Sequence, residues 1–283
     1  MYRPTGYRTI RFVLVAQQGA CAYRRTIMQA PPSTQIEPST AMHGGMRCGD
    51  CPIRYRAVCA QCEGEELAVL ERMKFYRSFE AGQPIVWEGD RMDFVASVVT
   101  GVATLTHVLE DGRTQMVGLL LPSDFLGRPG RDQAAYNATA ATGVVLCCFR
   151  RGPFDQMMQR TPHLAHRLLE MTLDELDAAR EWMLLLGRKT AREKIASFIA
   201  IIARRQAALQ KRRPAGRIAL ELPLTREAMA VYLGLTIETV SRQMTALHRD
   251  GVIEIAGKRG VTLTDYARLI QESGGYSDGG KAA

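Results

Sequence analysis

Apolar residues recur at spacings of three and four between Leu224 and Leu247, a period typical of amphipathic helices. Gly234 divides this stretch, and Thr225 and Thr236 each precede a helical pattern, as N-cap residues do. The stretch therefore predicts a helix-turn-helix, whose second helix enters the DNA major groove by its N-terminal part. The residues expected to face inward are Ala228, Met229, Leu233, Ile237, Val240, Met244 and Leu247.

The second of these helices carries polar residues on one outward face. Glu238, Ser241 and Arg242 stand at positions i, i+3 and i+4, which share a face of a helix. An arginine can donate two hydrogen bonds to guanine, and a glutamate can accept one from the paired cytosine. These residues, with Thr236 at the start of the helix, are therefore candidates for DNA binding. The alternative is a Glu238–Arg242 salt bridge on an ordinary solvated face.

A β-hairpin is predicted directly after the second helix. Residues 250–263 contain alternating apolar positions, and Lys258 and Arg259 lie at the expected tip. A basic hairpin in this place is suited to contact with DNA phosphates, which positions a protein without reading sequence. The whole segment therefore predicts a winged helix-turn-helix.

A long helix is predicted upstream, beginning at Thr161 and Pro162 and ending at Gly187, since proline is favoured at the first helical position. Its apolar stripe is narrow and resembles a seam between two helices. We expect a homodimer, because two recognition helices on a two-fold axis read a palindrome. The alternative is a helix that packs on its own barrel. The stripe consists of Leu169, Leu173, Leu176, Ala179, Met183 and Leu186.

Over residues 67–154 the sequence pattern changes to one of short predicted strands separated by turn residues. The clearest runs are Val95–Leu109, Met116–Leu121 and Val144–Phe149, with a hairpin signal at 110–113. Strands at this spacing predict a small antiparallel barrel or jelly roll. The fold class is therefore α+β, with an N-terminal antiparallel β-roll, a long dimerisation helix and a C-terminal winged helix-turn-helix.

Cysteines form the clearest chemical signal in the chain. Cys48, Cys51, Cys59 and Cys62 have the spacing C-x2-C-x7-C-x2-C, which in a reducing compartment indicates metal ligands rather than disulfides. Zinc would take all four, whereas an iron-sulfur cluster could take three and a fourth ligand from a distance. Spacing alone slightly favours zinc, and free thiols in a flexible arm remain the third alternative.

Two further cysteines, Cys147 and Cys148, fall in the last predicted strand. Side chains alternate along a strand, so these two point to opposite faces of the sheet. At least one of them is expected to be ordinary core material, because buried cysteine packs as a small apolar residue.

Composition and charge narrow the class of protein. The chain has 283 residues, 46% of them apolar, and nothing approaches the ~18 apolar residues of a membrane span, so we expect a cytoplasmic protein without a membrane partner. The net charge of +8 fits nucleic acid. Residues 188–217 hold ten Lys and Arg against one Glu, where they could meet the phosphate backbone.

The expected organisation has six parts. Residues 1–47 carry six Arg and one Glu without a sustained period, and two readings carry equal weight: an over-long gene start or a genuine basic arm. Cys21 lies there and receives no role. The parts are a disordered basic extension (1–47), a cysteine-rich arm (48–66), a β-roll sensor domain (67–158), the dimerisation helix (159–187), the DNA-binding domain (188–270) and a disordered tail (271–283).

The order of barrel, seam helix and winged helix-turn-helix resembles the superfamily of the cyclic-AMP receptor protein. Leu235–Arg242 and the cysteine-rich arm are similar to its FNR branch, the oxygen-responsive fumarate and nitrate reduction regulators, in particular those of photosynthetic and nitrogen-metabolising alphaproteobacteria. The resemblance covers about residues 48–270. It supports transcription regulation rather than an enzyme, and no catalytic partner accompanies the thiols.

The resemblance implies a 4Fe-4S cluster and so reverses the preference for zinc. Cys48, Cys51 and Cys59 match the arm ligands, although the gap of seven residues before Cys59 is longer than in the best-known member, and Cys147 matches the ligand from the barrel. Cys62 and Cys148 are the alternatives. The loaded protein is expected to dimerise without oxygen, to bind a TTGAT-N4-ATCAA type palindrome and to contact RNA polymerase, partly through the hairpin at 110–113. Oxygen is expected to degrade the cluster.

A cyclic nucleotide is not expected. Members of the superfamily that bind cyclic AMP have a Gly-Glu phosphate cassette with a downstream Arg-Ser or Arg-Thr, and residues 125–135 have no Glu in that place. The runner-up function is a constitutive, zinc-stabilised DNA-binding regulator that senses no oxygen.

Overall fold

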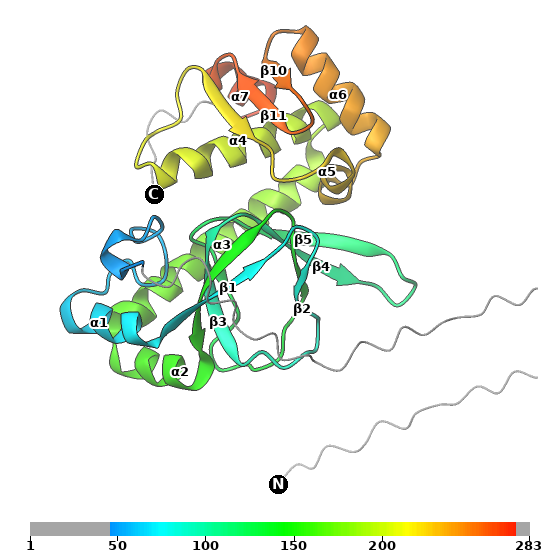
Figure 1. Cartoon of the computed structure of the whole chain (residues 1–283). Coiled ribbons are helices and arrows are strands. Elements are labelled where there is room, and N and C mark those ends of the chain that lie inside the picture. Colours follow the sequence, from blue (N-terminus) through cyan, green and yellow to red (C-terminus); the bar gives the residue numbers. More distant parts are fainter. Residues whose placement is uncertain (1–45, 276–283) are drawn as a thin grey trace, which may run out of the picture. The chain divides into compact units, whose positions relative to one another are not determined.

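The N-terminal part of the fold is built from short antiparallel strands. The computed structural model describes residues 46–275. Its first eight strands are β1 (Lys74–Phe79), β2 (Pro84–Val86), β3 (Phe94–Thr100), β4 (Ala103–Val108), β5 (Thr114–Leu120), β6 (Phe125–Leu126), β7 (Asn137–Ala140) and β8 (Val144–Arg150). In the described part they form two sheets, β1-β8-β3-β6 and β2-β7-β4-β5 (Figure 1). The predicted antiparallel β-roll is confirmed.

Side chains of the strands alternate between two apolar clusters. On β3, Ala96 and Val98 point into a core shared by both sheets, and Cys148 of β8 joins them there. Val95 and Val99 belong to a second cluster on the other face of the same sheet. The sheet that contains β8 is therefore buried on both faces, and its outer face is covered by the segment that carries the cysteines.

The cysteine arm, residues 46–63, consists of turns and one short 3-10 helix, η1 (Cys48–Asp50). Ile53, Ala57 and Val58 are buried in the same cluster as Val95. Two helices flank it: α1 (Gly64–Met73) and α2 (Arg151–Arg160). The strand prediction is thus wrong for residues 67–73, which belong to helix α1. This helix packs Leu70 into the cluster.

The long helix α3 runs over Pro162–Arg188 with proline at its start, as predicted. The residues of the predicted seam lie on its surface rather than on the β-roll. Exposed fractions are 56% for Leu169, 53% for Leu173 and 64% for Met183. The alternative that the whole stripe packs on its own barrel is therefore wrong. Only Leu186, near the C-terminal end, packs against the core of the DNA-binding part.

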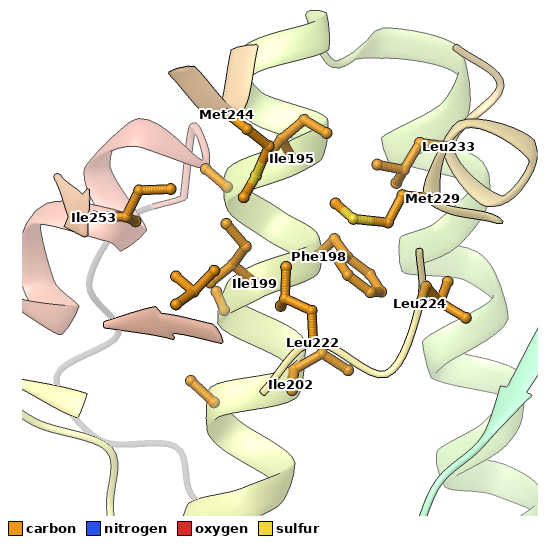
Figure 2. Close-up of a cluster of buried hydrophobic side chains, with 14 of the residues drawn as sticks. Ile195, Phe198, Ile199, Ile202, Leu222, Leu224, Met229, Leu233, Met244 and Ile253 are labelled. Carbon is orange, nitrogen blue, oxygen red and sulfur yellow. The ribbon is translucent and has the colours of Figure 1, made fainter. Parts of the chain in front are cut away.

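The C-terminal part packs around helix α4 (Ala191–Leu209), which starts with a capping box formed by Thr190 and Glu193. Figure 2 shows Ile195, Phe198 and Ile199 of this helix pointing into the core of the domain. The remaining elements are β9 (Ile218–Glu221), α5 (Arg226–Leu233), α6 (Ile237–Arg249), β10 (Ile253–Ala256), β11 (Gly260–Leu263) and α7 (Tyr266–Glu272). The predicted wing is the hairpin β10–β11, and β9 adds a third strand to it.

The turn between α5 and α6 follows the sequence prediction closely. The hydroxyls of Thr225 and Thr236 accept hydrogen bonds from the backbone N–H groups of Ala228 and Thr239, so each caps its helix. Gly234 has φ of 60°, a left-handed conformation that glycine adopts at low cost. One inward prediction is wrong: Ile237 is 44% exposed, because the first turn of α6 extends past the core.

The prediction of a disordered tail over 271–283 is wrong for its first residues. Residues 271–275 are described, and α7 continues to Glu272, whose carboxylate pairs with Arg192 at 2.7 Å. Leu269 is fully buried and anchors α7 in the core. The predictions for residues 1–45, including Cys21, and for 276–283 lie outside the described residues. Within the described ones, none of the helices combines the length and apolarity that crossing a membrane requires.

Truncation of Leu269 tests whether α7 belongs to the cooperative core. Leu269→Ala should lower the free energy of unfolding by about 2–5 kcal/mol, because it leaves a cavity under α7. Urea unfolding followed by far-ultraviolet circular dichroism measures the change. The matched control is Gln271→Ala in the same helix, where the side chain is exposed and the expected change stays within about 0.5 kcal/mol. Equal, small effects of both substitutions would show a frayed tail.

Candidate metal centre and nucleic-acid interface

Four cysteines line one small cavity between the cysteine arm and β8. Cys48 lies in η1, Cys51 follows it, and Cys59 comes from the turns beyond, while Cys147 enters from the strand. The cavity measures about 20 Å³, which corresponds to about one water molecule. The other lining residues are Ile53, Ala57, Val58, Leu70, Tyr76, Ser97 and Phe149. The tertiary fold thus gathers thiols that lie almost a hundred residues apart in sequence.

A buried guanidinium gives the arm its shape. Arg54 is 9% exposed, and its Nη1 donates to the carbonyl oxygens of Cys59 and Ala60 at 2.7 Å each. Its Nη2 donates to the carbonyl oxygen of Cys62. The arm lacks a regular ladder at these carbonyls, so one side chain supplies the donors that a helix or sheet would otherwise provide. Arg54 thereby fixes the turn that carries Cys59.

A second cation lies beside Cys48. Lys74, at the start of β1, donates from Nζ to the Sγ of Cys48 at 3.4 Å and to the carbonyl of Met46 at 2.5 Å. The same ammonium lies 3.6 Å from the carboxylate of Glu71, which also accepts from the backbone N–H of Cys48. Lys74 and Glu71 together tie the start of the arm to β1 and α1.

Burial affects the protonation of the other three thiols of the cavity. It raises the pKa of Cys51 and Cys147, and it raises the pKa of Cys59 to about 11. The neighbouring sulfur atoms contribute in the same direction, since each thiolate would repel the next. Without a bound cation these thiols therefore keep their protons at neutral pH. Metal binding would release the protons and so become stronger as pH rises.

The two alternative ligands lie outside the cavity lining. Cys62 is fully buried in the apolar cluster beneath the arm, and burial raises its pKa to about 11. Cys148 points between the two sheets, as strand alternation requires, and burial raises its pKa to about 12. Over residues 46–275, His, Cys, Asp and Glu form no group of three or more that could hold a metal ion. The cysteines are therefore arranged around a cavity without forming a closed single-ion site.

A second candidate site is the exposed face of α6. Glu238 and Arg242 are exposed and Ser241 is half-buried at the N-terminal end of this helix. Among the ion pairs of the described chain, none joins Glu238 to Arg242, so the salt-bridge alternative is not realised. The Arg242 guanidinium instead donates to Thr239 Oγ1 at 3.5 Å, the limit of a hydrogen bond. Both charged heads are thus available to a ligand.

The wing tip and the start of α5 together line a basic hollow. Lys258 and Arg259 occupy the tip of the β10–β11 hairpin, and Thr225 and Arg226 face them from α5. Sequence reasoning missed Arg226, which stands at the first position of a capped helix. A basic residue there was the available signal, because a helix N-terminus attracts phosphate. Arg259 also donates to the Pro223 carbonyl at 3.4 Å, which holds the tip against α5.

Much of the basic run 188–217 is used inside the protein rather than offered to DNA. Lys194 is 9% exposed and donates to the Leu233 carbonyl. Arg192 pairs with Asp250 and Glu272, Arg205 pairs with Asp124, and Arg217 pairs with Glu254. The expectation that this run as a whole meets the phosphate backbone is therefore wrong for these residues.

An antiparallel β-roll, a long helix with an exposed apolar stripe and a winged helix-turn-helix define a DNA-binding transcription regulator. The comparisons with known proteins give the family. Residues 163–272 match the Crp-like helix-turn-helix domain, and residues 76–161 match the cyclic nucleotide-binding domain. The chain belongs to the Crp/Fnr family of transcription regulators, and it is not an enzyme.

The similar proteins are bacterial regulators. The transcriptional activator protein FnrL of Cereibacter sphaeroides is 69% identical over 247 residues, which cover 87% of this chain and 98% of that protein. The nitrogen fixation regulation protein FixK of Bradyrhizobium diazoefficiens is 38% identical, with 84% and 97% covered. The structure of FixK2 from Bradyrhizobium japonicum aligns with a TM-score of 0.63 at 30% identity, covering 74% of this chain and 99% of that one.

Removal of Arg54 tests what holds the arm in place. Arg54→Ala removes the side-chain donor to three carbonyls, of which that of Cys59 keeps a hydrogen bond from the backbone N–H of Cys62, so the free energy of unfolding of the metal-free chain should fall by about 1–3 kcal/mol. The cavity thiols should also react faster with a thiol reagent. Arg54→Lys should recover little, because an ammonium cannot span the same three acceptors.

The control for Arg54 lies in the same arm. Arg47 pairs with Asp50 at 3.1 Å, but its side chain is 78% exposed, so Arg47→Ala should change stability by less than about 1 kcal/mol. Similar thiol reactivity in Arg54→Ala and Arg47→Ala would show that the guanidinium does not shape the arm.

Proposed function

We propose that this protein is an oxygen-responsive transcription activator whose DNA binding depends on a 4Fe-4S cluster held by Cys48, Cys51, Cys59 and Cys147. The observation that carries the proposal is the cavity that these four cysteines share. The 69% identity to a transcriptional activator named FnrL supports it. Without a cofactor, four cysteines lining one cavity, three of them in an arm of turns, would have no evident purpose.

The residues around the cavity suit such a cofactor. Four thiolates bring negative charge, and Lys74 is already hydrogen-bonded to one of the sulfur atoms. An iron-sulfur cluster bonds its cysteines to different iron atoms, so its ligands lie further apart than those of a single zinc ion. Four thiols around a cavity with no closed single-ion site are compatible with that requirement. When bound, the cluster supplies an oxygen-labile link between the arm and β8.

Polar contacts join the arm to α3, so a link between the arm and β8 would also affect the position of this helix. Arg167 donates from Nη2 to the Arg56 carbonyl at 2.7 Å, and Gln61 donates to the Glu170 carboxylate at 3.1 Å. Arg167 also pairs with Glu170 at 2.9 Å. Any displacement of the arm therefore strains the N-terminal half of α3. We propose that the arm position selects the homodimer-competent form of α3, whose exposed stripe supplies the interface.

The DNA target proposed for the dimer is a palindrome of the TTGAT-N4-ATCAA type. Glu238, Ser241 and Arg242 would read base edges, while Thr236 lies at the entry of α6 into the groove. Lys258, Arg259 and Arg226 would contact phosphates from the basic hollow. The chain would act where the chromosome lies, in the cytoplasm.

Contact with RNA polymerase is proposed for the β4–β5 hairpin. Its turn at 110–113 carries the Asp111–Arg113 ion pair, and Val108 and Leu109 are 47% and 41% exposed beside it. Exposed apolar residues next to charges are typical of a protein contact. The match to a cyclic nucleotide-binding domain concerns the fold, and the lack of Glu in residues 125–135 keeps the expectation of no cyclic nucleotide.

Purification without oxygen tests the cofactor. The protein should be brown, contain about four iron and four sulfide per chain, and bleach in air with loss of operator binding and of the dimer in size-exclusion chromatography. Cys147→Ser should abolish the colour, since the fourth ligand is lost, whereas Cys148→Ser, one residue along the same strand, should keep it. Cys62→Ser is the corresponding control in the arm.

Other outcomes of that purification refute the proposal. A colourless protein with one zinc per chain and the same operator affinity in air would establish the zinc-stabilised constitutive regulator. Loss of the colour in Cys148→Ser but not in Cys147→Ser would place the fourth ligand on the other face of β8.

Two substitutions separate base reading from phosphate contact. Arg242→Ala should weaken operator binding by about 1–3 kcal/mol and relax the choice of base at one pair of each half-site. Lys258→Ala should weaken binding to all sequences alike and reduce the salt dependence of log K by about one unit. Fluorescence anisotropy with the operator, a variant changed at one symmetric pair, and random DNA measures both effects. Uniform weakening by Arg242→Ala would contradict base readout.

A further inference from the structure

Three polar residues form a row across the sheet face that lines the cysteine cavity. The strands β1, β8 and β3 are neighbours, with Tyr76 paired to Cys147 and Cys147 paired to Ser97. Residues paired across antiparallel strands point to the same face, with Cβ atoms about 4.5–5.5 Å apart. All three side chains line the cavity. Cys147 is therefore flanked by a hydroxyl-bearing residue on each side.

The Ser97 hydroxyl is buried without a partner. Ser97 is 2% exposed, and its Oγ has no hydrogen-bond partner among residues 46–275. It lies between Val95 and Val99, which belong to the cluster beneath the arm, so the alternation of β3 directs it to the arm face. A buried hydroxyl without a partner is destabilising, so its presence in a folded protein calls for an explanation such as a bound ion, a water or a role at a redox site.

We propose that Ser97 donates a hydrogen bond to sulfur at the Cys147 corner of the cluster and thereby sets how readily the cluster is lost. This inference rests on the proposed function. The hydroxyl can rotate about one bond, and its neighbour across the strand pair is Cys147 itself. A donor to a ligand sulfur stabilises negative charge there, so it raises the reduction potential and strengthens retention of the metal.

Other polar groups at the cavity are already occupied. Lys74 is shared among Met46, Cys48 and Glu71, and the Arg54 guanidinium is directed to backbone carbonyls. Ser97 differs from these groups, because its hydrogen bond is not made within the protein. The metal-free chain therefore holds a donor that is satisfied only when something enters the cavity.

The test combines three variants in the full chain. Ser97→Ala removes the hydroxyl, Ser97→Thr keeps it, and Thr104→Val removes another buried hydroxyl of the β-roll. Thr104 is the matched control, because it is 7% exposed, donates to the Thr139 carbonyl and lies outside the cavity lining. Melting temperatures are measured for the metal-free chain and for the chain purified without oxygen. The reduction potential and the rate of iron loss to a chelator are measured for the second form.

The expected signs differ between the two forms. Ser97→Ala should raise the melting temperature of the metal-free chain, since an unpaired buried hydroxyl is removed, and lower that of the loaded chain. It should lower the reduction potential and speed iron loss about 10-fold, the usual effect of losing an outer-shell partner. Ser97→Thr keeps the hydroxyl and should therefore have the reduction potential and the rate of iron loss of the wild type. Thr104→Val should lower both melting temperatures without changing potential or iron loss.

Two results overturn the inference while leaving the proposed function intact. One is a loaded Ser97→Ala protein with unchanged potential and iron loss. The other is a metal-free Ser97→Ala chain that melts lower than the wild type, which would show that the hydroxyl has a structural partner such as a bound water. A wild-type chain that contains no iron and sulfide refutes the proposed function itself, and with it the cluster to which Ser97 would donate.

Discussion

The proposed metal centre depends on holding a segment without regular secondary structure against β8. Backbone carbonyls of such a segment need donors, and Arg54 provides them at Cys59, Ala60 and Cys62. Apolar burial of Ile53, Ala57 and Val58 presses the same segment onto the sheet. The two effects act on different atoms of the arm. Burial sets its distance from β8, and the guanidinium sets which way its turns, and hence its thiols, face.

A series of contacts leads from the arm along α3 to the first helix of the helix-turn-helix. The arm is hydrogen-bonded to α3 through Arg167 and Glu170, near the N-terminal end of that helix. At the other end of α3, the Trp182 ring stacks on Tyr232 of α5 with ring centroids 3.8 Å apart. Because an α-helix is stiff along its axis, a displacement of either end would shift the whole stripe that lies between the two ends. In the proposed switch, the exposed stripe is thus the part of the molecule on which both sites would act.

The parts of the fold that could be predicted are those whose signals are local. Thr225, Gly234 and Thr236 each fix the structure of a few neighbouring residues, so the helix-turn-helix follows from the sequence. Ile237 was misplaced because periodicity places it on the inward stripe but does not tell where the core ends. The choice between Cys147 and Cys148 depends on which face of β8 the arm covers. That is a tertiary fact, and spacing within a strand does not contain it.

The same limit applies to the basic run and to Ser97. Charge counting treats Lys194 and Arg192 as free cations, whereas folding brings Asp250, Glu272 and the Leu233 carbonyl to them from distant positions. Ser97 carries no signal in the sequence at all. It becomes a candidate only when β3 pairs with β8 and places it beside Cys147.

Magnitudes decide which contacts drive the proposed switch and which only transmit it. Moving a two-state equilibrium from 1:99 to 99:1 requires about 5.5 kcal/mol of differential affinity. The hydrogen bonds from Gln61 and Arg167 to α3 contribute on the order of 1 kcal/mol each, so they cannot supply that amount. Structural metal sites with thiolate ligands contribute about 10–16 kcal/mol in zinc-finger peptides, so about half of such a sum would suffice. The energy of switching must therefore come from the bonds to the four sulfur atoms. The polar contacts with α3 need only be stiff enough to make the arm and the helix move together.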